Sequence, residues 1–179
     1  MNIKDLKNEV NSLSDISKTL DEFKVSWIRP VKKHATNKLF QTKIKQLRHA
    51  VEDAKEGQII NQKLKTLAHH LVDLRITTIT NDHKTRSLVM HRFLHDPFLH
   101  IKQLITDVNN YERQVQELQQ LYTSIHHSVT EMLPLEDKIS ILDSHHQFTF
   151  QNILQTVQKQ KQLLKLIGTH FLKETRALR

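Results

Sequence analysis

The chain has 179 residues, of which 27 are Lys or Arg, 19 are Asp or Glu and none is Cys, and its formal net charge is +8. The length is enough for one domain, or two small ones, with a sizeable core, and the missing cysteines exclude disulfides and thiolate sites. No apolar run approaches the roughly 18 residues of a membrane span, and no secretory signal pattern opens the chain. We therefore expect a cytoplasmic protein without membrane contact, and its basic balance favours polyanionic partners such as nucleic acid or acidic protein segments.

The N-terminal part of the chain is expected to be helical, because two Gly and three Pro leave few breaks. Apolar residues recur every three or four positions over residues 3–27. This pattern predicts one helix that ends at Arg29-Pro30, since a residue before proline disfavours helical geometry. A second helix is predicted to follow Thr36 as its N-cap and to stop at Gly57.

The middle of the chain carries the spacing of two further helices. Residues 59–74 form an apolar stripe, and the β-branched run of residues 76–80 is expected to weaken the helix there. Another helix is predicted to begin near Thr85 and to meet a break at Asp96-Pro97.

The C-terminal part has the most regular pattern. Apolar steps of four and three run through residues 101–132, as in a coiled-coil seam. Pro134 interrupts the seam, which resumes over residues 139–171 with His146 and Gln160 as polar interruptions. Two long helices joined by a short turn pack antiparallel, so a helical hairpin is predicted here.

These elements together predict an all-α fold. We expect a helical bundle of about five helices with a long antiparallel C-terminal hairpin. The expected division places N-terminal helices with the basic stretch in residues 1–82 and the hairpin in residues 83–179, the two forming one continuous bundle.

Positive charge is concentrated in a segment that contains no Asp or Glu. Its cations are the expected nucleic-acid-binding residues, Lys24, Arg29, Lys32, Lys33, Lys38, Lys43, Lys45 and Arg48. The closing helix is also basic, and we expect Lys165 and Lys173 to contribute there. Cations of this kind suit the phosphates of a single strand or the carboxylates of a short acidic tail.

Aromatic residues are interleaved with these cations, as in surfaces that stack bases. Phe23, Trp27 and Phe40, however, lie on the apolar stripes of their predicted helices. We therefore expect all three rings in the core.

Enzymatic and metal-binding patterns are missing from the sequence. The chain has 13 His, but His91 and His95, one helical turn apart, supply only two ligands, and no HExxH motif occurs. There is no glycine-rich phosphate loop, GxSxG elbow or Cys nucleophile. We expect no catalytic residue, no metal and no cofactor.

Two short segments resemble a known family. The run Leu39-Phe40-Gln41-Thr42 looks like the LFQT segment of the primosomal replication-restart protein PriC (primosomal replication protein N'') family. The stretch Tyr111-Glu112-Arg113-Gln114-Val115 resembles the aromatic-Glu-Arg-Arg-Leu segment of the same family. Chain length and a basic last helix are similar too, so the resemblance covers nearly the whole chain.

The resemblance implies a non-enzymatic adaptor for replication restart. Such proteins act at abandoned forks, contact single-stranded or forked DNA, and bind the acidic, phenylalanine-terminated tail of single-stranded-DNA-binding protein. They also help the replicative helicase to load. For this chain the resemblance implies a cytoplasmic, nucleoid-associated protein, and we expect a monomer.

The resemblance also implies a tail-binding site. Its members here are Tyr111, Arg113, Gln114, Phe150, Lys159 and Lys161. Gln114 stands where the family has a second arginine, and Ile153 stands where it has a cation three residues after the last-helix aromatic. Losing a charge-assisted contact costs roughly 1.5–3 kcal/mol. We expect either replacement charge from Arg113, Lys159 and Lys161 or a weaker tail interaction.

Two alternatives stay open at this stage. The first is a coiled-coil structural or assembly protein without nucleic-acid binding, in which the seam of residues 101–132 pairs between chains. The second is a membrane-surface role for the basic last helix, which the polar positions of residues 155–162 disfavour.

Overall fold

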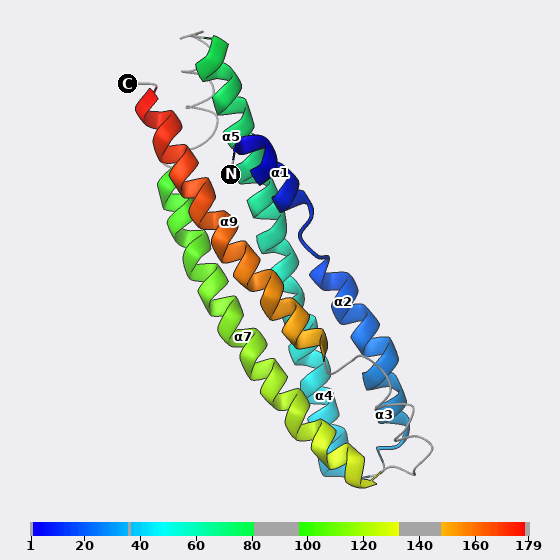
Figure 1. Ribbon diagram of the computed structural model, residues 1–179. Coiled ribbons are helices and arrows are strands. Elements are labelled where there is room, and N and C mark those ends of the chain that lie inside the picture. The colour runs from blue at the N-terminus through cyan, green and yellow to red at the C-terminus, as the bar shows by residue number, and fades with distance from the viewer. Residues whose placement is uncertain (1, 36, 81–96, 133–147, 178–179) are drawn as a thin grey trace. The chain divides into compact units, whose positions relative to one another are not determined.

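The computed structural model describes residues 2–35, 37–80, 97–132 and 148–177, and every regular element among them is helical (Figure 1). In chain order these are α1 (Ile3–Asn11), α2 (Ile16–Phe23), a π-helix (Lys24–Ile28), α3 (Arg29–Lys33), α4 (Lys38–Asp53), a 3-10 turn (Ala54–Glu56), α5 (Gly57–Thr80), α7 (Pro97–Met132) and α9 (Thr149–Ala177). The all-α prediction is confirmed. None of the described helices combines the length and the apolar character that crossing a membrane requires.

The contacts between helices divide the chain into two units, and each unit is assembled from separate stretches. The first unit contains Met1–Leu13, Ile59–Asn109 and Val157–Arg179, and the second contains Ser14–Gln58 and Asn110–Thr156. Helices α5, α7 and α9 therefore contribute residues to both units. The expected boundary at residue 82 lies outside the described residues and stays a prediction.

In the first unit α7 and α9 pack antiparallel, as the hairpin prediction required (Figure 1). A Cβ atom at Gly168 would lie 3.8 Å from Ile101, near the start of α7. Further along, Val108 of α7 and Leu164 of α9 line one hollow. Residue numbers thus rise along α7 while they fall along α9. Ile101, Val108 and Leu164 are buried, which confirms this part of the seam.

Two polar contacts tie α5 to α9 in the first unit. Gln160, a predicted polar interruption of the seam, is fully buried and its Nε2 donates to Oδ1 of Asn61 at 2.6 Å. Arg75 donates to the buried carboxylate of Glu174 at 3.1 Å. Buried polar pairs of this kind fix one register between two helices, because a shift would leave both groups without their partners.

The prediction of one helix over residues 3–27 is wrong, because the chain breaks between α1 and α2. Ser12 ends α1, and its hydroxyl donates to the carbonyl of Glu9 at 2.8 Å. Asp15 then caps α2 by accepting from the backbone N–H of Lys18 at 3.0 Å. Short polar side chains compete for backbone groups in this way and interrupt a helix even where the apolar stripe continues.

The predicted end at Arg29-Pro30 is also wrong, since the helical path continues through α3 to Lys33. A π-helix precedes the proline, and the backbone N–H of Arg29 donates to the carbonyl of Lys24, five residues back. Pro30 has no N–H, and its ring disfavours the regular α-helical turn before it. The wider π turn accommodates the proline without ending the helix.

Gly57 does not stop a helix, contrary to the prediction, but begins α5 with ordinary helical geometry. Its role is to let Tyr111 approach the backbone. The Tyr111 hydroxyl donates to the carbonyl of Ala54 at 2.7 Å, and a Cβ at Gly57 would come within 2.6 Å of Tyr111 Cε2. Burial, with a smaller contribution from the charge of Glu56, raises the pKa of Tyr111.

Stacked and edge-on aromatic rings form the core of the second unit. Phe23 stacks on Trp27 with ring centroids 5.7 Å apart, and Trp27 meets Tyr122 edge-on at 5.0 Å. Phe150 of α9 lies 5.0 Å from Phe23. Burial raises the pKa of Tyr122 to about 12. Phe23, Trp27 and Phe40 are 2%, 0% and 7% exposed, so the prediction of inward-facing rings is confirmed.

The remaining element predictions have mixed outcomes. Helix α5 continues through residues 76–80, so the expected weakening in that run is wrong. Helix α7 begins at Pro97, a favoured first helical position. The prediction of Thr36 as the N-cap of the second helix is wrong, because Asn37 caps α4 and its side chain accepts from the backbone N–H of Leu39 at 2.8 Å. Other predictions fall outside the described residues, namely the start near Thr85, the interruption at Pro134 and the seam position His146.

Candidate functional site

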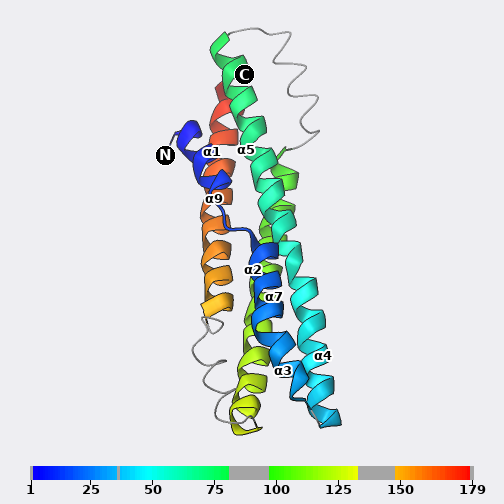
Figure 2. The same cartoon turned by 90° about the vertical axis from the view of Figure 1, so that its right-hand side faces the viewer.

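Figure 2 shows α3 and α4 side by side in the second unit. Side chains of the π-helix and α3 line a groove together with side chains of α4. The groove consists of two adjoining hollows, which share the lining residues Lys32 and Arg48. The first, of about 560 Å³, is lined by Lys32, Gln41, Ile44, Lys45, Arg48 and His49. The second, of about 460 Å³, is lined by Asp21, Lys24, Val25, Ile28, Arg29, Lys32 and Arg48. We call the two together the basic groove.

Four cations of the basic groove carry uncompensated charge. Arg29 and Lys32 stand three residues apart on one wall, and Lys45 and Arg48 stand three residues apart on the other. All four are exposed, and in the described part of the chain no carboxylate forms an ion pair with any of them. Residues three apart on a helix face the same way, so the charges of each wall point into one channel. Such a channel attracts an anionic chain.

Lys24 also lines the groove, but its charge is neutralised, contrary to the expectation of an uncompensated run. Its ammonium pairs with Glu52 of α4, and Lys55 bridges Glu52 at 3.0 Å and Asp21 at 2.6 Å. Hydrogen bonds from Lys24 and then Lys55 lower the pKa of Glu52. Hydrogen bonds to Asp21 and then Glu52 raise the pKa of Lys55. This charged network joins α2 and the π-helix to α4 beside the groove.

The other expected nucleic-acid-binding residues do not line the basic groove. Lys33 and Lys38 are exposed near the ends of α3 and α4, and Lys43 is half-buried on α4. Lys165 and Lys173 lie on α9 in the first unit, where Lys165 lines a separate hollow of about 300 Å³. The structure therefore gathers about half of the predicted set into one site.

The predicted tail-binding residues are distributed over both units. In the second unit Tyr111 and Phe150 are both fully buried, so neither ring is accessible to a partner in this structure. Arg113 is exposed and Gln114 is half-buried on the same helix. These two are the members of the predicted set that the second unit leaves accessible.

Two predicted tail-binding lysines belong to the first unit. Lys159 pairs with Glu9 of α1 at 3.0 Å and donates to the hydroxyl of Ser12 at 2.9 Å, so its charge is used within the unit. Lys161 lines the same hollow as Lys165, together with Ile105 and Leu164. Lys159 thus holds α1 on α9, which is a structural role that the sequence did not suggest.

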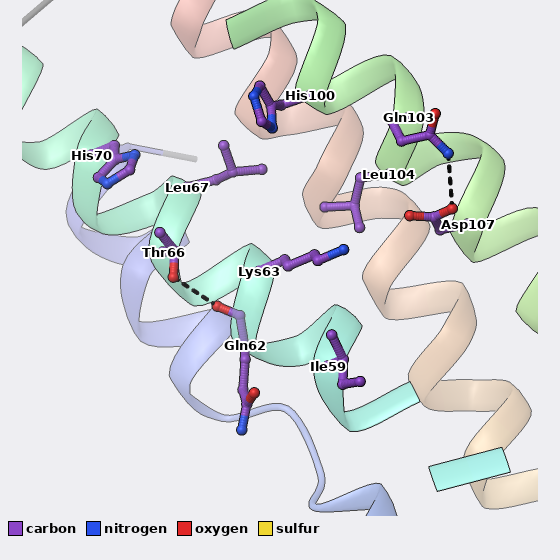
Figure 3. A pocket seen from close by; sticks show the side chains of 10 residues that line it. All are labelled: Ile59, Gln62, Lys63, Thr66, Leu67, His70, His100, Gln103, Leu104 and Asp107. Atoms are coloured by element: carbon purple, nitrogen blue, oxygen red, sulfur yellow. Dashed lines mark hydrogen bonds between the residues drawn. The ribbon is translucent and has the colours of Figure 1, made fainter. Parts of the chain in front are cut away.

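A second, less charged cleft lies in the first unit between α5 and α7 (Figure 3). Its volume is about 350 Å³, and Leu67 and Leu104 lie at its base while Ile59 is half exposed at one end. Lys63 extends from α5 towards α7, where Asp107 accepts a hydrogen bond from Gln103 at 3.1 Å. This mixed polarity gives the cleft no strong preference for one sign of charge.

Histidines form no metal site in the residues that the structure describes. His69 faces Asp73 at 3.5 Å and His127 faces Glu131 at 3.7 Å, each pair on one exposed helix face. The pair His91 and His95 lies outside the described residues.

Six groove residues were missed at the sequence level: Asp21, Val25, Ile28, Gln41, Ile44 and His49. A signal for them exists, because positions 41, 44, 45 and 48 follow the i, i+3, i+4, i+7 spacing of one helix face. The same spacing relates positions 25, 28, 29 and 32. Sorting the cations by helical face would have separated Lys43 from Lys45 and Arg48.

The geometry of the basic groove therefore offers electrostatic capture of an anionic chain over an aliphatic floor of Val25, Ile28 and Ile44. Comparison of the chain with protein-family models, with curated proteins and with solved structures finds no match.

Proposed function

We propose that this chain is a replication-restart adaptor that binds single-stranded DNA through the basic groove. The observation that carries the proposal is the convergence of Arg29, Lys32, Lys45 and Arg48 on one groove without carboxylate partners among the described residues. A single strand follows such a channel because each neutralised phosphate releases counterions. No catalytic step is part of the proposal.

The protein partners in the proposal rest on the family resemblance of the sequence. They are the acidic tail of single-stranded-DNA-binding protein and the replicative helicase, which the adaptor would help to load at a stalled fork. Arg113 is the exposed cation of the predicted tail site in the second unit, so we assign it the tail carboxylates. The cellular place implied is the cytoplasm, at the nucleoid.

The alternative of a coiled-coil assembly protein has less support. It needs the seam of α7 to be open for another chain. The seam residues Ile101, Val108, Tyr122 and Val129 are buried within the single chain. We therefore favour the binding function.

The DNA-binding proposal is tested by anisotropy titration of a labelled oligothymidine strand at several salt concentrations. Four phosphate contacts predict a slope of about −3 in log association constant against log salt. The double variant Lys45→Gln/Arg48→Gln should bind at least about tenfold more weakly and lose about 1.4 of that slope. The control Lys33→Gln/Lys38→Gln removes the same charge outside the groove.

The control should change binding by less than about threefold, because surface charges away from the strand act only through screened long-range attraction. Equal losses in the two double variants would show that binding depends on net charge and not on the groove. No binding of wild type at low salt would remove the proposal. A separate titration with an acidic, phenylalanine-terminated peptide, comparing wild type with Arg113→Ala, tests the tail contact, and unchanged affinity would show that Arg113 is not part of it.

A further inference from the structure

Single-strand-binding grooves commonly hold bases on exposed aromatic rings, and in the described part of the chain the basic groove has no such ring. No Phe, Tyr or Trp is among the described residues that line it, and of these residues His49 alone carries an aromatic ring, an imidazole. Trp27 belongs to the same π-helix as Lys24, Val25 and Ile28, yet it is fully buried. The π-helix therefore turns its one cation, Lys24, towards the groove and the ring of Trp27 towards the core.

The groups that could read base edges are also engaged elsewhere. The side-chain amide of Gln41 donates from Nε2 to the backbone carbonyl of Ala35 at 2.7 Å. The carboxylate of Asp21 pairs with Lys55 at 2.6 Å. Specific base contacts in proteins come from amides, carboxylates, guanidinium groups and ammonium groups. Among the described lining residues, the arginines and lysines are therefore left as the groups able to contact a base, and these are the same cations that attract phosphates.

The apolar part of the groove lining is aliphatic. Val25 is 54% exposed, and with Ile28 and Ile44 it forms the apolar part of the groove. Aliphatic side chains offer dispersion contacts to a sugar or a base edge but no stacking face. The cations supply the strong attraction, and it acts on phosphates.

From these observations we infer that the basic groove binds the phosphodiester backbone of a single strand and does not hold its bases. This inference rests on the proposed function and specifies its ligand as any single-stranded polyphosphodiester, whatever bases it carries. Strand affinity is then set by the number of phosphates along the groove. The bases remain outside, where they are free to pair or to bind another protein.

The experiment compares two fluorescein-labelled strands of equal length at the same salt, oligothymidine and an abasic strand that keeps the sugar-phosphate backbone. Backbone binding predicts affinities within about fivefold of each other and the same salt slope. If even one base stacked in the groove, its loss would weaken binding by about 5- to 150-fold. A loss of more than fivefold for the abasic strand therefore overturns the inference.

Two variants test which groove side chains contribute to the binding of each strand. Lys45→Gln/Arg48→Gln should weaken both strands by the same factor, and any change caused by His49→Ala should be the same for both strands. A loss with His49→Ala that is confined to the base-bearing strand would identify the imidazole as a stacking group and overturn the inference. If oligothymidine binds and the abasic strand does not, the proposed function survives and the inference fails. If neither strand binds, both fail.

Discussion

The two glycines of the chain lie in opposite surroundings, although both are in helices. Gly57 faces Tyr111, whose buried ring is fixed by the hydrogen bond to Ala54. Among the described residues, a Cβ added at Gly168 would meet Ile101 alone, at an ordinary contact distance of 3.8 Å. Glycine in a helix interior costs about 0.5–1 kcal/mol relative to alanine. Close packing against Tyr111 explains why glycine is present at position 57 despite that cost. Nothing in the structure explains the glycine at position 168.

Alanine substitutions at the two sites should therefore have opposite effects. Gly57→Ala forces a methyl group onto Tyr111 and should lower the free energy of unfolding by about 1–3 kcal/mol. Gly168→Ala should raise it by about 0.5–1 kcal/mol through helix propensity and reduced chain entropy. Denaturant unfolding of the two variants beside wild type measures both. Equal destabilisation by the two substitutions would contradict the packing argument.

His126 should make the stability of the protein depend on pH. Its half-buried ring lies 6.1 Å from Trp27 and 5.5 Å from Tyr122, and burial, with the neighbouring His127, lowers its pKa. The unfolded chain takes up a proton on this residue near pH 6.5, but the folded chain does so only at lower pH. Stability is thus highest above about pH 6.5 and falls as the pH drops towards the folded pKa.

The measurement is the unfolding free energy of wild type and His126→Gln at pH 7 and at pH 5. The variant should lose less stability between the two values than wild type does. His100→Gln serves as the matched control, because that histidine is exposed and belongs to the first unit, whereas His126 belongs to the second. A pH dependence that is unchanged in His126→Gln would show that other groups, such as the half-buried His70, cause it.

At the scale of single elements, the sequence predicted α7 and α9 well because one apolar period runs through each, interrupted in α9 only at Gln160 among the predicted seam positions. The sequence-based prediction failed where a capping contact or a long-range packing contact overrides the apolar period. The stripe through residues 3–27 is real, yet Ser12 and Asp15 end one helix and begin another within it. Glycine is common at helix ends, so Gly57 was predicted to stop a helix. The residue that explains the glycine at this position, Tyr111, is more than fifty positions away in the sequence. Such long-range contacts leave no local signal.

The candidate site, like the helices, could be predicted from the sequence only in part. The acid-free run from Lys24 to Arg48 contains the five cations that line the basic groove. The partner of Lys24, however, is Glu52, which lies just beyond that run and reaches back between helices. Charge compensation between elements depends on their packing, so a count of charges along the chain could not reveal it.

Glu52 lies beside the groove and should restrain its positive field. Glu52→Gln removes the carboxylate that neutralises Lys24 and adds a fifth cation to the groove. Affinity for oligothymidine should rise severalfold, and the salt slope should steepen by about 0.7. Stability should fall by less than about 1 kcal/mol, since the ion pair is exposed.

Anisotropy titrations and denaturant unfolding measure these two effects separately. Glu131→Gln is a suitable control, because that carboxylate is exposed on α7 and does not line the groove. Affinity that rises equally in both variants would show a general effect of net charge. Affinity that falls in Glu52→Gln would show that the charged network is needed to shape the groove.

At the scale of the whole molecule, the chain should be monomeric, because α7 has its seam filled by the same chain in each unit. In the first unit Ile101 and Val108 lie against α9, and in the second Tyr122 lies 5.3 Å from Phe150. Sedimentation equilibrium should give the monomer mass at all concentrations. A dimer that strengthens with concentration would support the assembly alternative and would require α7 to leave its intramolecular partner.

The placement of the aromatic residues has a spectroscopic consequence. The chain has one Trp and two Tyr, and Trp27, Tyr111 and Tyr122 all belong to the second unit. Intrinsic fluorescence therefore follows the melting of that unit alone, whereas far-ultraviolet circular dichroism follows the helices of both. Coincident curves from the two signals would mean that the interleaved units lose their structure as one cooperative system, and separated curves would give each unit its own transition.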